Sequence, residues 1–524
     1  MAVRALARRF PAIDAYLVGV VAIASVYGAV LPIVLFTAKW VYAVPFVLAT
    51  VFPLVLYASG NPRLFFLVGM VFTAPLGLSI NLRGYQHMGG AHAFSINLCD
   101  FFLVPLLVFL LRDFYTGARR DVRIPPISAW WLALAAMGAV TVVTGPFREL
   151  AAMEVVRMLK LWLLFLVIVN ECVRAKQILW VVAALAANAV LNMAIAIAQF
   201  AVKRNLGLQP LGEGSEISTL GANLGVYVME GAVFRVTGLA GHANLYGALL
   251  ALTLPIYIAL LYTDIRPRAK VALWVVIAGS VACLGLTLSR SSWIAFAASG
   301  GLLMLALFTL PGLRSRFLAL KFLTIAAVGA GLMAGSGMIL RRLMQSDSGA
   351  LDFRFEWLTV AWKMVQDRPV FGFGLNSFIH NLEGYAPYSV AGMYELFGDV
   401  FPVVHNIYML VWSEQGTVGL LLFLALHAHV FWIMLQNLRL GELDGRLYMV
   451  SIACGCGMVA ILIDGMSSFF IRVQAHGRVF WIVIGLIVAI HYWNVANARV
   501  RRGRDAGAGP DPGMAPPAVT RSDA

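Results

Sequence analysis

The chain has 524 residues, of which 61% are hydrophobic and only 12% are charged. Soluble domains carry roughly 25% charged and about 45–50% apolar residues, so the composition excludes a soluble globular protein and indicates an all-α, polytopic integral membrane protein. The formal net charge of +14 is explained by Lys and Arg in cytoplasmic loops, which orient membrane proteins. We therefore expect no nucleic-acid partner.

Apolar runs along the chain predict a bundle of about 12–14 transmembrane helices, because a spanning helix needs about 20 mostly apolar residues. The candidate spans lie near 14–37, 40–58, 63–80, 98–112, 127–144, 157–171, 177–200, 243–262, 270–288, 291–310, 317–338, 417–436, 447–470 and 478–496. The runs at 98–112 and 157–171 are short, so they are expected to tilt or to begin inside a loop.

The charges of the loops predict which side of the membrane each loop occupies. With a cytoplasmic N-terminus, every loop assigned to the cytoplasm contains Arg or Lys, from "SGNPR" to the tail "NARVRRGRD", as the positive-inside rule requires. Both termini are then cytoplasmic. Two long segments, 201–242 and 339–403, lie on the outer side, and long loops are where binding and catalytic residues concentrate.

Three arginines, Arg235, Arg290 and Arg354, fall on this outer side. A single arginine near a membrane end is most simply a side chain that reaches to the interface. Three of them are harder to explain in this way, because arginines that set topology belong on the opposite face. A cluster of guanidinium groups suits phosphate or diphosphate, which arginine binds in a bidentate manner.

His405 opens a short apolar stretch on the same side, "HNIYMLVWSEQGTVG". Residues 405–415 cover only about 16 Å as a helix, so they are predicted to form an interfacial helix that bends at Gly416 into the next span. Glu414 points away from the face that carries His405. The histidine is either a hydrogen-bonded interfacial residue, a helix cap or a catalytic base, since histidine is the most frequent general base.

The donor is limited by motifs that the sequence lacks. There is no G-x-x-x-x-G-K-[ST] loop for ATP and no Asp-x-Asp pair for a metal-held nucleotide sugar. A polyprenyl diphosphate-linked sugar fits an outer-face enzyme, because it is already activated, it reaches the site through the bilayer, and arginines can bind its diphosphate.

The segment from about 220 to 440 resembles the O-antigen ligase and O-antigen polymerase family of bacterial membrane glycosyltransferases. The matching pieces occur in the family's order: "RVTGLAGHANLYG", "LSRSSWIAF", "FRFEWLTVAWKMVQDRPVFGFGLNSF" and "HNIYMLVWSEQGTVG". The last has the family's pattern of His-Asn, nine residues and Gly-x-x-Gly. The resemblance implies a fold like that of the all-helical lipid-linked-sugar glycosyltransferases (GT-C-like), with a large periplasmic loop region and no cofactor or metal.

The resemblance also implies roles for individual residues. His405 would deprotonate the acceptor hydroxyl, Arg235 and Arg290 would bind the diphosphate, and Arg354 would bind substrate. Substrate contacts are further expected from Asn406, His242 and Asn244, and a structural role from Pro369, Gly372, Gly374, Gly416 and Gly419. The reaction would be an inverting transfer from undecaprenyl diphosphate.

The resemblance and the hydropathy pattern together suggest four parts. These are an N-terminal transmembrane bundle at 1–200, a catalytic core at 201–440 with periplasmic loops 201–242 and 339–416, transmembrane helices at 441–500, and a Pro/Gly-rich tail at 501–524 that is expected to be disordered and cytoplasmic.

The acceptor distinguishes two functions that the sequence leaves open. A ligase would use lipid A-core, whereas a polymerase would use a lipid-linked glycan and could bind a chain-length regulator, in both cases at the bacterial inner membrane. A lipid-linked oligosaccharide transporter or flippase is the alternative class. It is disfavoured because charged residues gather at the outer face and no internal repeat is evident, although Asp464 lies deep in its span.

Overall fold

The computed structural model describes residue 56 and residues 59–85, 89–119, 122–214, 234–334, 337, 348–387, 403–441 and 444–505. The predicted span 14–37, and all of 40–58 except residue 56, lie outside these residues. The chain divides into two compact units, Met1–Phe66 and Leu67–Ala524. The features described below belong to the second unit, apart from the start of its first helix.

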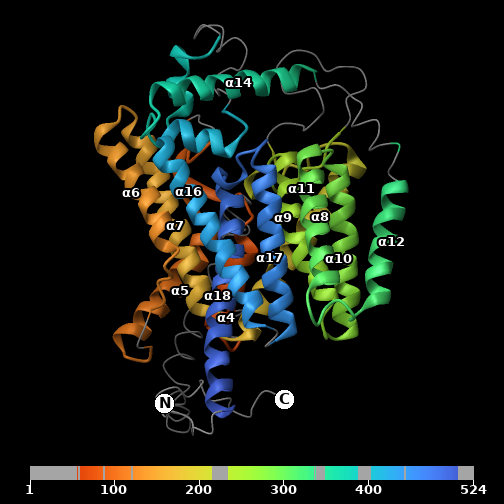
Figure 1. The fold of residues 1–524 in the computed structure, drawn as a ribbon. Coiled ribbons are helices and arrows are strands. Elements are labelled where there is room, and N and C mark those ends of the chain that lie inside the picture. The colour runs from red at the N-terminus through yellow and green to blue at the C-terminus, as the bar shows by residue number, and fades with distance from the viewer. Residues whose placement is uncertain are drawn as a thin grey trace, which may run out of the picture. The chain divides into compact units, whose positions relative to one another are not determined.

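Helices make up most of the described chain, which confirms the polytopic helical membrane fold (Figure 1). Seven of the described helices are long and apolar enough to cross a membrane: α8 (Ala175–Val202), α9 (Ala243–Leu261), α10 (Pro267–Leu286), α11 (Arg290–Thr309), α16 (Ile407–Leu440), α17 (Gly445–Asp464) and α18 (Gln474–Asp505). Shorter or more charged helices occupy the other predicted spans within the described residues: α4 (Pro62–Thr73), α5 (Leu98–Tyr115), α6 (Ser128–Thr144), α7 (Arg148–Glu171) and α12 (Leu318–Ala334). Three short 3₁₀ helices connect longer elements: η1 (Gln209–Leu211), η3 (Phe378–Gly384) and η4 (Phe470–Arg472).

The predicted span at 63–80 is wrong in its second half. Helix α4 ends at Thr73, two residues before Pro75, because proline cannot continue the helical hydrogen-bond ladder. A hairpin follows, in which β1 (Ser79–Gly84) pairs antiparallel with β2 (Ala93–Asn97). The sequence analysis did not predict these strands.

Helix α7 is longer than its predicted span, since it begins at Arg148 and not near residue 157. Its first turns carry charges that interrupt the apolar run. Glu154 and Arg157, three residues apart, form a buried ion pair whose charges cancel. The helix therefore continues through a stretch that the hydropathy pattern assigned to a loop.

Helices α9 and α17 form the centre of the bundle, because 89% and 83% of their apolar segments are buried. Figure 1 shows α9 and α17 among the other membrane helices of this unit. Ala251 of α9, Ala295 of α11 and Ala460 of α17 form one hydrophobic cluster, and all three are fully buried. Small side chains let membrane helices pack closely, so this cluster favours close packing of the three helices.

Helix α14 (Ser348–Asp367) lies across one end of this helical unit, at a steep angle to α16 and α17 (Figure 1). It buries Trp357, Val360 and Met364, whose spacing places them on one helical face, and it exposes Phe355 and Trp362. Part of the predicted outer segment 339–403 is therefore an amphipathic helix that covers the end of the bundle.

Helix α16 consists of two helical pieces that meet at Gly416. That glycine has φ 65° and ψ −170°, a conformation that essentially only glycine adopts. The first piece, 407–415, is the predicted short interfacial helix, and the bend lies at the residue where the sequence placed it.

Candidate active site

Three helices begin at the same end of the bundle, each after a polar residue. His242 precedes α9, and its Nδ1 accepts the backbone N–H of Asn244 at 3.2 Å. Ser289 precedes α11, and Asn406 precedes α16 and accepts two N–H groups of its first turn, both at 3.0 Å. Helix N-termini carry partial positive charge and unpaired N–H groups, so this end of the bundle favours an anionic ligand.

Arg235 is held against the starts of α9 and α11. Its Nε donates to the carbonyl of Thr287 at 2.7 Å, and its Nη2 donates to the Asn244 side chain. The residue is buried. A guanidinium fixed on two sides is already oriented, so little side-chain freedom is lost when an anion binds to it.

A chain of hydrogen bonds joins α9, α11 and α17 behind this arginine. The Ser292 hydroxyl lies 2.9 Å from that of Ser289 and 3.4 Å from both the Asn244 carbonyl and Oδ1 of Asp464. Asp464 is fully buried at the end of α17. The N-termini of α9 and α11 therefore meet the C-terminus of α17 in one polar layer.

His405 lies directly before α16, and its position is set by backbone contacts. Its Nδ1 is 2.9 Å from the carbonyl of Val403. Since a carbonyl only accepts, Nδ1 carries the proton, and Nε2 is the nitrogen with a free electron pair. The imidazole packs edge-on against Phe469, with ring centroids 5.3 Å apart. Two residues later, the Ile407 N–H binds the carbonyl of Gly465 at 2.9 Å, which joins the start of α16 to the end of α17.

Electrostatics link His405 to residues from α9 and α14. Burial, together with the smaller effect of the Arg354 guanidinium, lowers the pKa of His405 to about 4. Burial also lowers the pKa of His242 to about 3, with contributions from Arg235, His405 and Arg354. Both histidines are therefore neutral near pH 7. A neutral imidazole with a free Nε2 is the form that can accept a proton.

The structure brings together the residues that the sequence analysis placed on the outer side. Arg235, Asn244 and His242 meet at the start of α9. Arg290 is the first residue of α11. The positive charge of Arg354, on α14, lowers the pKa of His405. Asn406 is a helix cap whose Nδ2 also donates to the Met466 carbonyl at 3.1 Å.

The predicted structural residues lie at the bend of α16. The Pro369 carbonyl accepts the N–H of Thr417 at 2.7 Å, and the Gly374 N–H donates to the Glu414 carbonyl at 2.8 Å. Gly372 and Gly416 approach each other so closely that a Cβ on Gly416 would lie 2.2 Å from the Val370 carbonyl oxygen. A Cβ on Gly419 would meet the Gln415 side chain instead.

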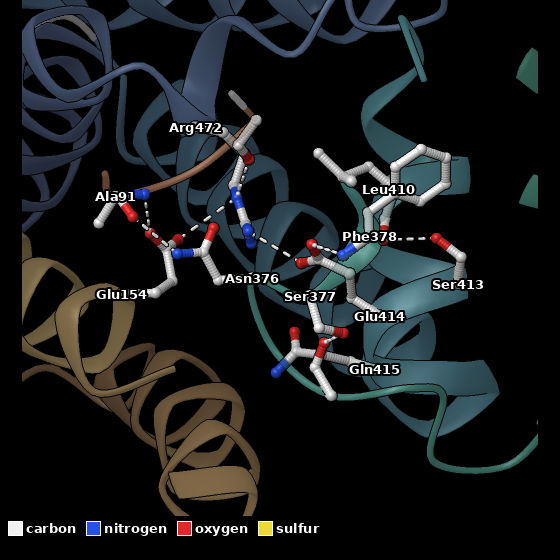
Figure 2. Close-up of polar contacts among 12 residues, drawn as sticks. Ala91, Glu154, Asn376, Ser377, Phe378, Leu410, Ser413, Glu414, Gln415 and Arg472 are labelled. Carbon is white, nitrogen blue, oxygen red and sulfur yellow. Dashed lines mark hydrogen bonds and ion pairs between the residues drawn. The ribbon is translucent and has the colours of Figure 1, made fainter. Parts of the chain in front are cut away.

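Sequence reasoning missed a second buried polar cluster, which Figure 2 shows beside the bend. In it, Arg472 binds Glu154 of α7 and Glu414 of α16. The sequence analysis places Glu414 on the helix face opposite His405 and predicts no partner for it. The one available signal was the presence of ionisable residues inside or beside apolar runs, which are rare in membrane proteins and require partners.

Within the described residues, no three His, Cys, Asp or Glu side chains gather closely enough to hold a metal ion. The side chains available for ligand binding at this end are the arginines, the histidines, the serines of the α11 start and Asp464.

The fold and the site together define a polytopic membrane protein with a cationic, histidine-containing site at one end of its helical core. Residues 273–424 match the family model described as O-antigen ligase. This match covers 152 of the 524 residues, and it supports membership of the O-antigen ligase and polymerase family and a role of that type in polysaccharide biosynthesis. The matched range contains Arg290, Arg354 and His405, whereas Arg235 and His242 precede it. No curated protein matches the chain.

Proposed function

We propose that the chain transfers a glycan from undecaprenyl diphosphate to a sugar hydroxyl of an acceptor at the periplasmic face of the bacterial inner membrane. The observation that carries the proposal is the state of His405. Its Nδ1–H is bound to the Val403 carbonyl, its Nε2 is free to accept a proton, and Arg354 acts on it from α14. The family match supports the polysaccharide context.

The proposed reaction is a single displacement. His405 Nε2 takes the proton of the acceptor hydroxyl, and the oxygen attacks the anomeric carbon of the donor sugar. The bond from that carbon to the diphosphate oxygen breaks, and its electron pair stays on the leaving diphosphate. Arg235 and Arg290, at the starts of α9 and α11, stabilise the negative charge that develops there. Attack from the side opposite to the leaving group inverts the anomeric centre.

The donor's chemistry fits the arrangement of charges. Diphosphate carries several negative charges, and the site combines oriented guanidinium groups with helix N-termini. Each is suited to an anion and requires no metal ion to bind it. The acceptor is either lipid A-core, for a ligase, or a lipid-linked glycan, for a polymerase.

The test is complementation in a strain that lacks the chromosomal copy of this gene. His405→Ala is expected to lower transfer by about 10²–10⁴-fold, the usual contribution of a general base. Arg290→Ala is expected to lower it by about 10²–10³-fold, as for loss of one charge-stabilising group. Lipopolysaccharide and secreted polysaccharide are analysed separately. Loss of lipid A-linked glycan identifies a ligase, and a single repeat unit without longer chains identifies a polymerase.

Matched controls come from the same helix, α16. His429 and Arg439 lie further along it, outside the site, so His429→Ala and Arg439→Ala should retain transfer. An enzyme defect leaves donor exposed at the outer face of the membrane. Absence of donor from the outer face would instead indicate a transporter, and full activity of both site variants would refute the proposed mechanism.

A further inference from the structure

Four charged side chains form a buried cluster beside the bend of α16, and Figure 2 shows Glu154, Glu414 and Arg472 of this cluster. Arg472 Nη2 lies 2.8 Å from Glu414 Oε2, and Arg472 Nε lies 3.3 Å from Glu154 Oε1. Arg157 Nε donates to Glu154 at 2.8 Å. All four residues are at most 6% exposed. With two cations and two carboxylates the cluster is neutral, which is the condition for burying charges without a large penalty.

Glu414 anchors the end of the short helix 407–415. One carboxylate oxygen accepts the backbone N–H of Phe378 at 3.2 Å, and the other binds Arg472. Its backbone carbonyl accepts the N–H of Gly374 at 2.8 Å. The short helix is thus attached at its far end to the loop around 374–378, while its near end begins two residues after His405.

Arg472 also holds in place the segment that contacts the His405 imidazole. It belongs to η4, which directly follows Phe469, and the Phe469 ring packs against the imidazole. Its Nε also donates to the Gly89 carbonyl at 2.8 Å. The Glu414–Arg472 ion pair therefore connects the helix that follows His405 to the turn that supplies the aromatic wall beside it.

We propose that the Glu414–Arg472 ion pair is a positioning device for His405, which holds the short helix against the 469–472 turn and so keeps the imidazole between Phe469 and the Val403 carbonyl. Neither residue contacts the reacting atoms; both act through His405. As far as catalysis is concerned, the inference rests on the proposed function, in which His405 is the base.

If the ion pair positions His405, Glu414→Gln changes the pKa of that histidine in a direction that the loss of a purely structural contact does not. The charged and titratable groups that act on His405 are Arg354 from α14 and His242 from the start of α9, and this substitution leaves both in place. Removing a carboxylate would by itself lower the pKa of the histidine through electrostatics. Release of the imidazole into water would raise it toward the ordinary value of about 6.5. The sign of the change therefore separates the two effects.

The experiment follows the reactivity of His405 with diethyl pyrocarbonate, which reacts with a histidine side chain only when its imidazole is neutral. The full chain in lipid nanodiscs is treated at pH 5 and pH 8, and modification at His405 is quantified by mass spectrometry. The wild-type ratio of the two rates should be near one, because the pKa of about 4 leaves the imidazole neutral at both. For Glu414→Gln we expect the pH 5 to pH 8 ratio to fall about tenfold, as the pKa rises to about 6, toward the ordinary value.

Two further variants keep the test decisive. Asn437→Ala is the matched control. Asn437 is a fully buried polar residue near the C-terminal end of α16, and its side chain donates to the Ser451 hydroxyl and the Ile487 carbonyl. It should lower thermal stability without changing the ratio. If Glu414→Gln does not fold, the double variant Glu414→Gln with Arg472→Gln removes both charges and avoids an unpaired one.

The outcomes separate this inference from the proposed function. A folded Glu414→Gln protein with an unchanged ratio overturns the positioning role, even if His405→Ala is inactive. A lowered ratio combined with full activity of His405→Ala establishes the positioning and refutes the catalytic role. A lowered ratio in Asn437→Ala as well would show a general loosening, and would also overturn the specific role of the ion pair.

Discussion

Two contacts fix the imidazole of His405. The Val403 carbonyl selects its tautomer, and the Phe469 ring packs edge-on against it. Burial and Arg354 both favour the neutral form. A histidine at a membrane surface would otherwise titrate near pH 6.5 and would be half-protonated at mildly acidic pH.

The lowered pKa predicts an unusual pH dependence of the transfer reaction. A base must be deprotonated to act, so activity that depends on it is present above its pKa and is lost as the pH falls through that value. With a pKa of about 4, kcat/KM should stay level from pH 7 to pH 5 and fall only below that. An acidic limb with a midpoint near 6.5 would show that His405 is not held in the environment described here.

At the scale of elements, the bend of α16 depends on a close approach between two glycines from different segments. Gly416 and Gly372 both have positive φ, and the 369–374 segment lies against the break, where it binds carbonyl and N–H groups that the helix leaves open. The bend separates the short helix after His405 from the long membrane-spanning piece. The bend therefore determines where His405 lies relative to the membrane-spanning part of α16.

Replacement of Gly416 by alanine should be much more damaging than replacement of Gly441, which ends the same helix. Both have nearly the same backbone conformation, φ 65° and ψ −170° against φ 79° and ψ −174°, so the strain of about 1–3 kcal/mol is shared. Only at Gly416 would the new Cβ meet backbone, 2.2 Å from the Val370 oxygen, since nothing lies within 4 Å of a Cβ on Gly441. Thermal unfolding of both variants in the same detergent measures the difference. Equal midpoints would contradict the close approach.

For the molecule as a whole, helix direction places the site and the basic loops at opposite ends. The starts of α9 and α11 meet the end of α17. The end of α9 and the starts of α10 and α17 therefore lie at the other end, where Arg266 precedes α10, Arg268 lies in its first turn and Arg446 lies in the first turn of α17. Positive residues mark the cytoplasmic side, so we infer that the site is periplasmic.

Cysteine labelling tests this orientation, because all five native cysteines are buried and should give little background. Glu383→Cys, at an exposed position of η3, should react with a membrane-impermeant maleimide in spheroplasts. Arg268→Cys, at the exposed start of α10, should react only after lysis. The reverse pattern would invert the orientation and place His405 on the cytoplasmic side.

Local patterns in the sequence were sufficient for several features of the site. The His-Asn pair and Gly416 indicated the short helix and its bend, and the alternation of spans placed Arg235, Arg290 and His405 at one end. The hairpin at 79–97 was missed because polar strands between apolar runs have no hydropathy signal that distinguishes them from a loop. The Arg472 cluster was missed because Glu154 and Arg472 are far apart in the chain and meet only through the packing of α7 beside η4 and α18.

The sequence by itself determined the membrane class and most helix positions, and it predicted the resemblance to the O-antigen ligase family, because apolar length and motif spacing are local properties of the chain. Only the tertiary structure decided the tautomer of His405, the orientation of Arg235 and the ion pair between Glu414 and Arg472. These depend on which backbone carbonyls and side chains from distant segments are brought within hydrogen-bonding distance, and that is set by how the helices pack.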